Sequence, residues 1–230
     1  MSVGGILDQS FGLYQRFIWR FAATAAIVFA VLDLLSALSA TSDSVEAGLL
    51  WALVGLVVSI VGTFWVQGAL TEAVIDVRDG RIDTTISELF RRTQPRLPAL
   101  IVAGLLASIG IGIGLIVLIV PGLYLLTRWA VIVPVIVVEG RRAGEAFSRS
   151  SQLTAGHRWT VLGVSVVTLL VYFILGGLAS GFLRAILPEF LGAWLGSLVV
   201  HSLFTPLLAL AWTTMYFELV NLKPAPSPAV

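Results

Sequence analysis

The 230-residue chain contains no cysteine and few charged residues. The absence of cysteine excludes disulfides, thiolate-bound metals, covalent haem attachment and lipid anchors on a cysteine within this sequence. Charged residues make up 12% of the chain and hydrophobic residues 58%, whereas an ordinary soluble domain has about 25% charged and about 45–50% apolar residues. This composition argues against a water-soluble domain.

Lysine and histidine are also scarce, which narrows the chemistry open to the chain. Lys223 is the only lysine among the 14 basic residues, so no lysine is present for a phosphate-binding loop or a serine–lysine dyad within the membrane. The two histidines, His157 and His201, fit no metal-ligand spacing, and neither an H-E-x-x-H nor a G-x-S-x-G motif occurs. We expect no catalytic activity, no metal, no cofactor and no nucleic-acid partner.

Long uncharged runs dominate the sequence instead. Residues 97–126 and 160–182 carry no charge, and each run exceeds the ~20 residues that cross a bilayer core. The predicted fold class is therefore an all-α, polytopic membrane bundle of six transmembrane helices with short amphipathic interfacial helices. The predicted spans are residues 17–39, 47–70, 97–118, 122–138, 159–183 and 191–220. The N-terminus lacks the pattern of a cleavable signal peptide, so the first span is expected to act as its own insertion signal.

The third and fourth spans run almost together and are divided at Val120-Pro121-Gly122, because a Pro-Gly pair favours a turn. One helix over residues 97–138 would be ~63 Å long, about twice the bilayer core. A two-span hairpin is the better prediction. Pro134 in the fourth span and Pro206 in the sixth are expected to kink their helices.

Arginine and lysine fall almost entirely on one side of the predicted membrane. That side holds 12 of them, whereas the other side holds only Arg184. The positive-inside rule then places both termini and the connectors 71–96 and 139–158 in the cytoplasm. The use of arginine over lysine points to a GC-rich bacterial genome, so the predicted location is the bacterial cytoplasmic membrane. The 12 residues are Arg16, Arg20, Arg78, Arg81, Arg91, Arg92, Arg96, Arg141, Arg142, Arg149, Arg158 and Lys223.

The two connectors share a sequence pattern that hydropathy alone does not show. Asp79-Gly80-Arg81 precedes Phe90-Arg91-Arg92-Thr93 in the first, and Glu139-Gly140-Arg141 precedes Phe147-Ser148-Arg149-Ser150 in the second. Apolar residues at helical spacing lie in both connectors and in an N-terminal segment. This pattern predicts three tandem units, residues 1–70, 71–138 and 139–222, each an interfacial helix followed by a hairpin. The alternative is that connectors of membrane proteins are commonly basic and amphipathic.

These connectors supply candidate contacts with membrane lipids or with a membrane-protein partner. Their apolar faces would lie on the inner leaflet, with arginines toward anionic headgroups. In the alternative, the connectors cover the cytoplasmic end of the bundle. The candidate contact residues are Arg81, Arg91, Arg92, Arg141, Arg142 and Arg149. Residues 1–222 are expected to form one membrane domain, and residues 223–230 a disordered tail.

Small residues recur at four-residue spacing in the spans, which lets helix backbones approach closely in lipid. We expect them at helix contacts in a compact bundle. The rows are Gly104, Ser108 and Gly112; Gly110 and Gly114; Gly177 and Gly181; and Gly192 and Gly196.

Three ionisable residues fall well inside predicted spans, where such groups are costly and mark candidate sites. Arg128 lies 11 residues before Glu139, or ~16 Å from the cytoplasmic end, and Asp33 and His201 are expected at similar depth. In one interpretation, Arg128 binds an anion or lipid phosphate in a hydrated cavity, and Asp33 or His201 modulates it. In the other, Arg128 and Asp33 form a buried ion pair, and His201 is hydrogen-bonded inside the bundle.

The central stretch carries a family resemblance. Pro121-Gly122-Leu123-Tyr124, Arg128, Pro134, Val138-Glu139-Gly140 and the segment from Ala146 to Trp159 resemble the membrane-domain family named after glycerophosphoryl diester phosphodiesterases, and related uncharacterised six-span bacterial proteins. The resemblance implies an integral membrane module that is sometimes joined to a soluble phosphodiesterase domain. A barrel of that type needs ~250 residues of its own, so we expect the catalytic domain to be absent here.

Together these features favour a non-catalytic membrane protein that serves as a scaffold or accessory and organises lipids or a membrane partner. The alternative is a small transporter or channel with a hydrated pathway near Arg128. Solvent accessibility at mid-span distinguishes the two.

Overall fold

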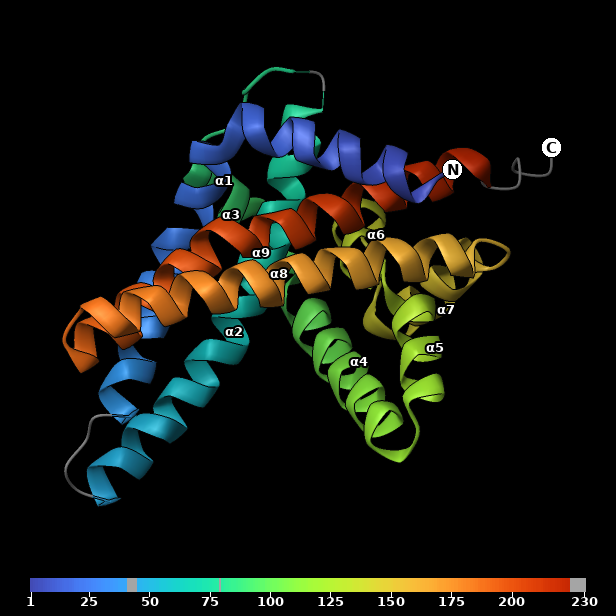
Figure 1. Cartoon of the computed structure of the whole chain (residues 1–230). Coiled ribbons are helices and arrows are strands. Elements are labelled where there is room, and N and C mark those ends of the chain that lie inside the picture. The colour runs from blue at the N-terminus through green and yellow to red at the C-terminus, as the bar shows by residue number, and fades with distance from the viewer. Residues whose placement is uncertain (41–44, 79, 224–230) are drawn as a thin grey trace.

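The computed structural model describes residues 1–40, 45–78 and 80–223, and these residues form helices without strands (Figure 1). Six stretches are long and apolar enough to cross a membrane, which confirms the six predicted spans. The chain is therefore a multi-pass membrane protein. The helices that build the spans are α1 (Val3–Ala40), α2 (Val45–Val77), α4 (Leu97–Val117), α5 (Ile119–Trp129) with α6 (Ile132–Glu139), α8 (Arg158–Ile186) and α9 (Glu189–Leu222).

The first helix, α1, is longer than the predicted first span and bends at Phe17. The backbone there leaves the helical region, with φ −122° and ψ 25°. In Figure 1 the stretch before the bend runs along the edge of the molecule above α9, and the stretch after it turns down past α9 and α8 to form the span. Ile6 and Tyr14 are buried on the first stretch, whereas Phe11 is exposed. The predicted amphipathic N-terminal segment is thus helical, but it continues into the span.

The turn between the third and fourth spans lies at Leu118, three residues before the predicted Pro-Gly break. Leu118 is extended, with φ −155° and ψ 136°, and separates α4 from α5. Pro121 falls in the first turn of α5, where a missing N–H costs no intrahelical bond. The hairpin prediction is confirmed, and the predicted position of its turn is corrected.

The fourth span is broken rather than merely kinked. α5 ends at Trp129 and α6 begins at Ile132, two residues before Pro134. Pro134 has no N–H to donate to the carbonyl of Ala130, so a continuous helix would lose a bond here. α9, by contrast, runs through Pro206 as one helix.

Two short connector helices complete the chain: α3 (Ile86–Thr93), followed by a 3₁₀ turn over Gln94–Arg96, and α7 (Ala143–Thr154). α3 begins at its N-cap Thr85, so Ile82, which the sequence pattern placed on its apolar face, lies before the helix and is exposed. Each hairpin of spans follows a short helical segment, and Figure 1 shows the hairpins splaying away from the side that holds the N-terminus. This order of elements agrees with three tandem units, although their relation as repeats stays a prediction. Residues 224–230 of the predicted tail lie outside the described residues.

Glycines permit the closest helix approaches at some of the predicted positions. A Cβ on Gly114 would lie 2.9 Å from the Cα of Gly122, so the two arms of the α4–α5 hairpin touch through backbone. A Cβ on Gly104 would overlap the Phe64 ring. The pair Gly177 and Gly181 has no atom within 4 Å of either added Cβ, so the prediction that it mediates helix packing is wrong.

The buried apolar side chains form two clusters, and α9 contributes to both. Ile136, Leu153 and Met215 belong to the cluster around α6 and α7. Phe21, Leu70 and Leu210 belong to the cluster between α1, α2 and α9. Because buried residues of α9 recur along its length, this last helix holds the other hairpins together.

Candidate functional site

Two of the three intramembrane candidates lie together. His201 Nδ1 on α9 is 2.8 Å and 3.0 Å from the two carboxylate oxygens of Asp33 on α1. The Asp33 side chain is 6% exposed, and the His201 ring stacks on Phe29 with a centroid distance of 4.6 Å. The prediction that His201 is hydrogen-bonded inside the bundle is confirmed, whereas the predicted ion pair between Asp33 and Arg128 is wrong.

A hollow of about 210 Å³ opens beside this pair, between α8 and α9. His201, Tyr172 and Ser197 line it. With Nδ1 engaged by Asp33, the other ring nitrogen of His201 has no hydrogen-bond partner among the described residues. The hollow therefore contains the His201 ring, which the Asp33 carboxylate orients. Among the described residues, no nucleophilic side chain is hydrogen-bonded to that ring.

Arg128 lies in a different part of the molecule, against the second connector. Its Nε donates to Ser151 Oγ at 3.3 Å, and Ser150 Oγ donates to the Arg128 carbonyl at 2.8 Å. The predicted depth assumed one straight helix from residue 128 to residue 139, and the break at Ala130 and Val131 invalidates that count. Arg128 is thus a neighbour of α7 rather than of Asp33 and His201.

Two guanidinium groups meet at one aromatic ring next to Arg128. The Cζ of Arg128 is 5.6 Å from the centroid of the Tyr124 ring, and the Cζ of Arg158 is 4.8 Å from the same centroid. Neither arginine has a carboxylate partner among the described residues. Arg128, near the end of α5, and Arg158, at the start of α8, therefore each place a positive charge beside the Tyr124 ring.

The first connector is clamped to the bundle by partly buried ion pairs. Arg96, which follows α3, donates to Glu72 on α2 at 2.5 Å. Arg20 on α1 donates to Asp76 on α2 at 2.6 Å and to the carbonyl of Thr84, just before α3, at 2.5 Å. These contacts join α3 to α1 and α2, the two arms of the first hairpin. The apolar face of α3 therefore packs on protein rather than on lipid.

The second connector is held by Glu139 at the end of α6. Its carboxylate accepts hydrogen bonds from Arg141 Nε at 2.6 Å, from Arg149 Nε at 2.9 Å and from the Tyr216 hydroxyl at 3.1 Å. The bond to Glu139 raises the pKa of the Arg141 guanidinium, which stays charged. Lys223 at the end of α9 donates to the carbonyls of Gln152 and Ala155. The structure therefore favours connectors that cover one end of the bundle.

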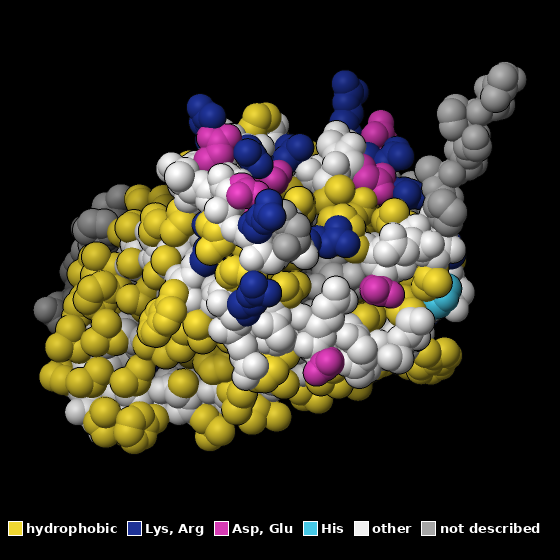
Figure 2. All heavy atoms as spheres, turned by 90° about the horizontal axis from the view of Figure 1, so that it is seen from above, with side chains coloured by type: hydrophobic (Ala, Val, Ile, Leu, Met, Phe, Trp, Pro, Cys, Tyr) yellow, Lys and Arg dark blue, Asp and Glu magenta, His cyan; other side chains and the backbone are white. Residues whose placement is uncertain are grey.

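The predicted contact arginines differ in their exposure and in the ion pairs that they form. Arg91 and Arg92 pair with Glu88 on their own helix, yet their side chains are 78% and 52% exposed. Arg142 is exposed and forms no ion pair among the described residues, whereas Arg149 is mostly buried against Glu139. Arg81 is exposed as well. Figure 2 shows basic and acidic side chains gathered in one area beside a broad hydrophobic surface.

Sequence reasoning missed a polar interior. A cavity of about 70 Å³ between α2, α6 and α9 is lined by Gln67, Thr71, Thr205 and Thr213, and a neighbouring cavity of about 160 Å³ shares Gln67 and Trp212 with it. The indole nitrogen of Trp212 and the hydroxyl of Thr213 are buried, and neither has a hydrogen-bond partner among the residues that the structure describes. In the sequence, this polar interior is indicated only by the scattered polar residues of α2 and α9.

The part of the chain that the structure describes holds no cluster of three or more metal-ligating side chains. Residues 96–219 match the family model described as domain of unknown function DUF7847, and the chain belongs to this family. No curated protein and no solved structure matches the chain. The resemblance to the phosphodiesterase-associated membrane domain stays a prediction.

Proposed function

We propose that this DUF7847 family member is a non-catalytic scaffold or accessory of the bacterial cytoplasmic membrane, with both termini and both connectors cytoplasmic, and that it gathers anionic lipids around its cytoplasmic end. The observation that carries the proposal is the clamping of both connectors. Ion pairs through Glu72 and Glu139 hold α3 and α7 on the bundle, so the remaining exposed arginines occupy fixed positions.

Electrostatics supports a lipid-gathering role for this surface. A basic residue near an anionic leaflet is worth about 1 kcal/mol, an effect that falls off within a Debye length of ~8–10 Å. Arg91 and Arg92 on α3 and Arg142 just before α7 are exposed, and the apolar sides of both helices already pack on protein. The positions of these charges therefore do not depend on insertion of the connector helices into the membrane.

The test is the preference of the reconstituted protein for spin-labelled phosphatidylglycerol over spin-labelled phosphatidylcholine. The triple variant Arg91→Gln, Arg92→Gln, Arg142→Gln should lose much of that preference, and added salt should weaken it in the wild type. The matched control replaces the same residues by lysine, which keeps the charge. An unchanged preference in the glutamine variant contradicts the lipid-gathering role and directs attention to a protein partner.

A small transporter or channel is a second candidate, and one observation favours it. The fourth span is broken at residues 130–131, and Ala130 lines the larger interior cavity. Non-helical backbone at membrane depth is found where protein buries it or where it lines a water-filled path. The unpartnered Trp212 nitrogen and Thr213 hydroxyl add polar groups beside that break.

Cysteine labelling separates the two candidates because the chain has no native cysteine. A single cysteine at Thr213 should react with a membrane-impermeant thiol reagent if a hydrated path reaches the cavity. A cysteine at Val66, which is fully buried and lines neither cavity, is the control. Protection of both positions supports the sealed scaffold, whereas selective labelling at Thr213 supports transport.

A further inference from the structure

A groove of about 340 Å³ runs between α5 and the start of α8, apart from both interior cavities. Val120 and Leu123 from α5 and Trp159 and Leu162 from α8 form its apolar walls. Val120 is 75% exposed and Trp159 is 86% exposed, so the groove opens outward. In a multi-pass membrane protein, an outward apolar surface on spanning helices meets lipid chains.

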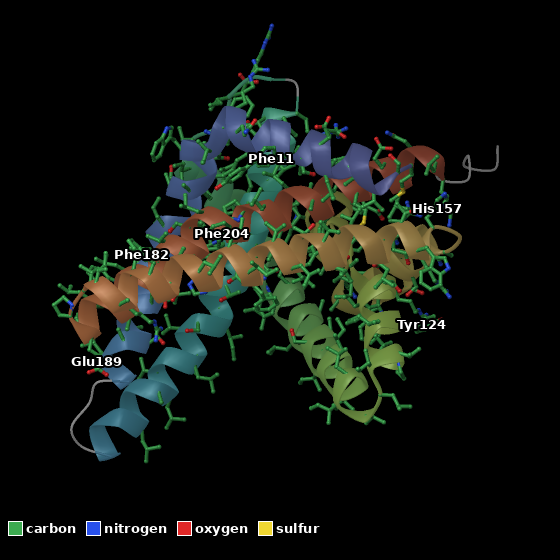
Figure 3. All side chains as sticks on the ribbon, viewed as in Figure 1. Phe11, Tyr124, His157, Phe182, Glu189 and Phe204 are labelled. Carbon is green, nitrogen blue, oxygen red and sulfur yellow. The ribbon has the colours of Figure 1, made fainter. Side chains whose placement is uncertain are left out.

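Charge gathers at one end of this groove. Arg158 lines the groove directly, whereas Arg128 does not line it but contacts the ring of Tyr124, which lines the groove and is also contacted by Arg158. Figure 3 shows Tyr124 on α5 and His157, which precedes α8, on the same side of the molecule. Most connector arginines have carboxylates close by, whereas in the part of the chain that the structure describes Arg128 contacts Ser151 and Tyr124, and Arg158 contacts Tyr124.

The backbone at this end of the groove also favours an anion. α8 begins at Arg158, and the N-cap residue His157 makes no side-chain hydrogen bond to the first turn. The free N–H groups and the helix dipole at such an N-terminus attract negative charge. They add to the two guanidinium groups rather than acting alone.

We propose that this groove binds one anionic phospholipid, whose phosphate is held between Arg128 and Arg158 and whose acyl chain lies along α5 and α8. The two positive charges select an anionic headgroup, and arginine is well suited to phosphate because its planar fork donates two parallel hydrogen bonds. A free phosphate would leave the apolar walls uncovered. Trp159 suits the headgroup boundary, since an indole ring is favoured at the membrane interface.

This lipid site extends the proposed function and rests on it, because a scaffold that gathers anionic lipid needs sites at which that lipid binds. It is nevertheless separate from the connector surface of Arg91, Arg92 and Arg142. An experiment can therefore contradict the specific lipid site in the groove without contradicting the diffuse lipid preference at the connectors, and the reverse also holds.

The experiment is native mass spectrometry of the purified full chain titrated with phosphatidylglycerol or with phosphatidylcholine of the same acyl chains. We expect the wild type to retain one phosphatidylglycerol and to prefer it over phosphatidylcholine. The double variant Arg128→Gln, Arg158→Gln should weaken this binding by at least about tenfold. Arg184→Gln, at the opposite end of α8, and the triple connector variant should both retain it.

Three outcomes would overturn the proposal: equal retention of both lipids, full retention of phosphatidylglycerol by the double variant, or displacement of the lipid by millimolar inorganic phosphate, which would indicate a free-anion site. The variant Arg128→Lys, Arg158→Lys guards against misfolding as an explanation. It keeps both charges and should retain part of the binding, and a thermal unfolding midpoint close to that of the wild type shows that each variant is folded.

Discussion

His201 Nδ1 lies 2.8 Å from one carboxylate oxygen of Asp33 and 3.0 Å from the other, so a histidine of the last helix is tied to a carboxylate of the first. Both residues sit within spans, where water is scarce and an unpaired carboxylate is costly. The pair also explains why a histidine is tolerated on α9. It fixes α9 against α1 at this depth.

Replacing His201 by alanine should destabilise the protein by about 1–3 kcal/mol, because Asp33 is then buried without a partner. Combining it with Asp33→Ala should cost less than the sum of the single changes, with a coupling of ~0.5–3 kcal/mol. Unfolding in mixed micelles measures both values.

The neighbouring Ser202 provides the control for that cycle. Its hydroxyl is buried without a hydrogen-bond partner, so Ser202→Ala should leave stability unchanged or raise it slightly. A loss from Ser202→Ala as large as that from His201→Ala would mean that the site responds to any change in packing and that the pair has no special role.

The spans were predictable because an uncharged run longer than the bilayer core has few alternatives to a membrane helix. The sequence also predicted the helical connectors and the α4–α5 hairpin. It could not predict which intramembrane charges meet, since Asp33 is paired by a residue 168 positions away through the packing of α1 on α9. Nor did it locate Arg128, because the break before Pro134 removes the straight helix on which a depth count depends.

Glu139 should be the residue on which the position of α7 depends most. Its carboxylate joins Arg141, Arg149 and Tyr216, and thus links the end of α6 to α7 and α9. Glu139→Gln should lower stability by about 1–3 kcal/mol, because the amide cannot replace the charge-assisted bonds. Hydrogen exchange over residues 143–154 should speed up accordingly.

Glu145 on the same helix is the matched control for Glu139. It is exposed and forms no ion pair among the described residues, so Glu145→Gln should leave both stability and exchange within error. Equal exchange in the two variants would show that Glu139 does not hold α7 in place.

Replacement by alanine should destabilise the protein at Gly114 but not at Gly112. An added Cβ on Gly114 would lie 2.9 Å from the backbone of Gly122, whereas an added Cβ on Gly112 meets nothing within 4 Å. Gly114→Ala should therefore cost about 1–3 kcal/mol by forcing the α4–α5 hairpin apart. Gly112→Ala should be neutral or stabilising. Thermal unfolding midpoints of the two variants decide, and equal midpoints contradict the close approach.

Arg20 should be far more sensitive to replacement than Arg16, one helical turn earlier. The Arg20 side chain is 10% exposed and binds Asp76, which is 6% exposed, and the carbonyl of Thr84. Arg20→Met leaves the Asp76 carboxylate buried without a counter-charge, with the Thr84 hydroxyl as its remaining donor, which should cost about 3–5 kcal/mol. Arg16 is exposed, lies over the Phe17 ring at 5.3 Å and beside Gly80, and forms no ion pair among the described residues, so Arg16→Met should change stability by about 0.5 kcal/mol or less.

The double variant Arg20→Met, Asp76→Leu tests the reason for that cost. Removing both charges leaves no buried carboxylate, so much of the lost stability should return even though the ion pair is gone. Limited proteolysis between residues 80 and 86 reports separately on the bond to Thr84, and cleavage there should stay fast in both variants. Failure of Asp76→Leu to restore any stability would show that Arg20 acts mainly by packing its long side chain between α1 and α2.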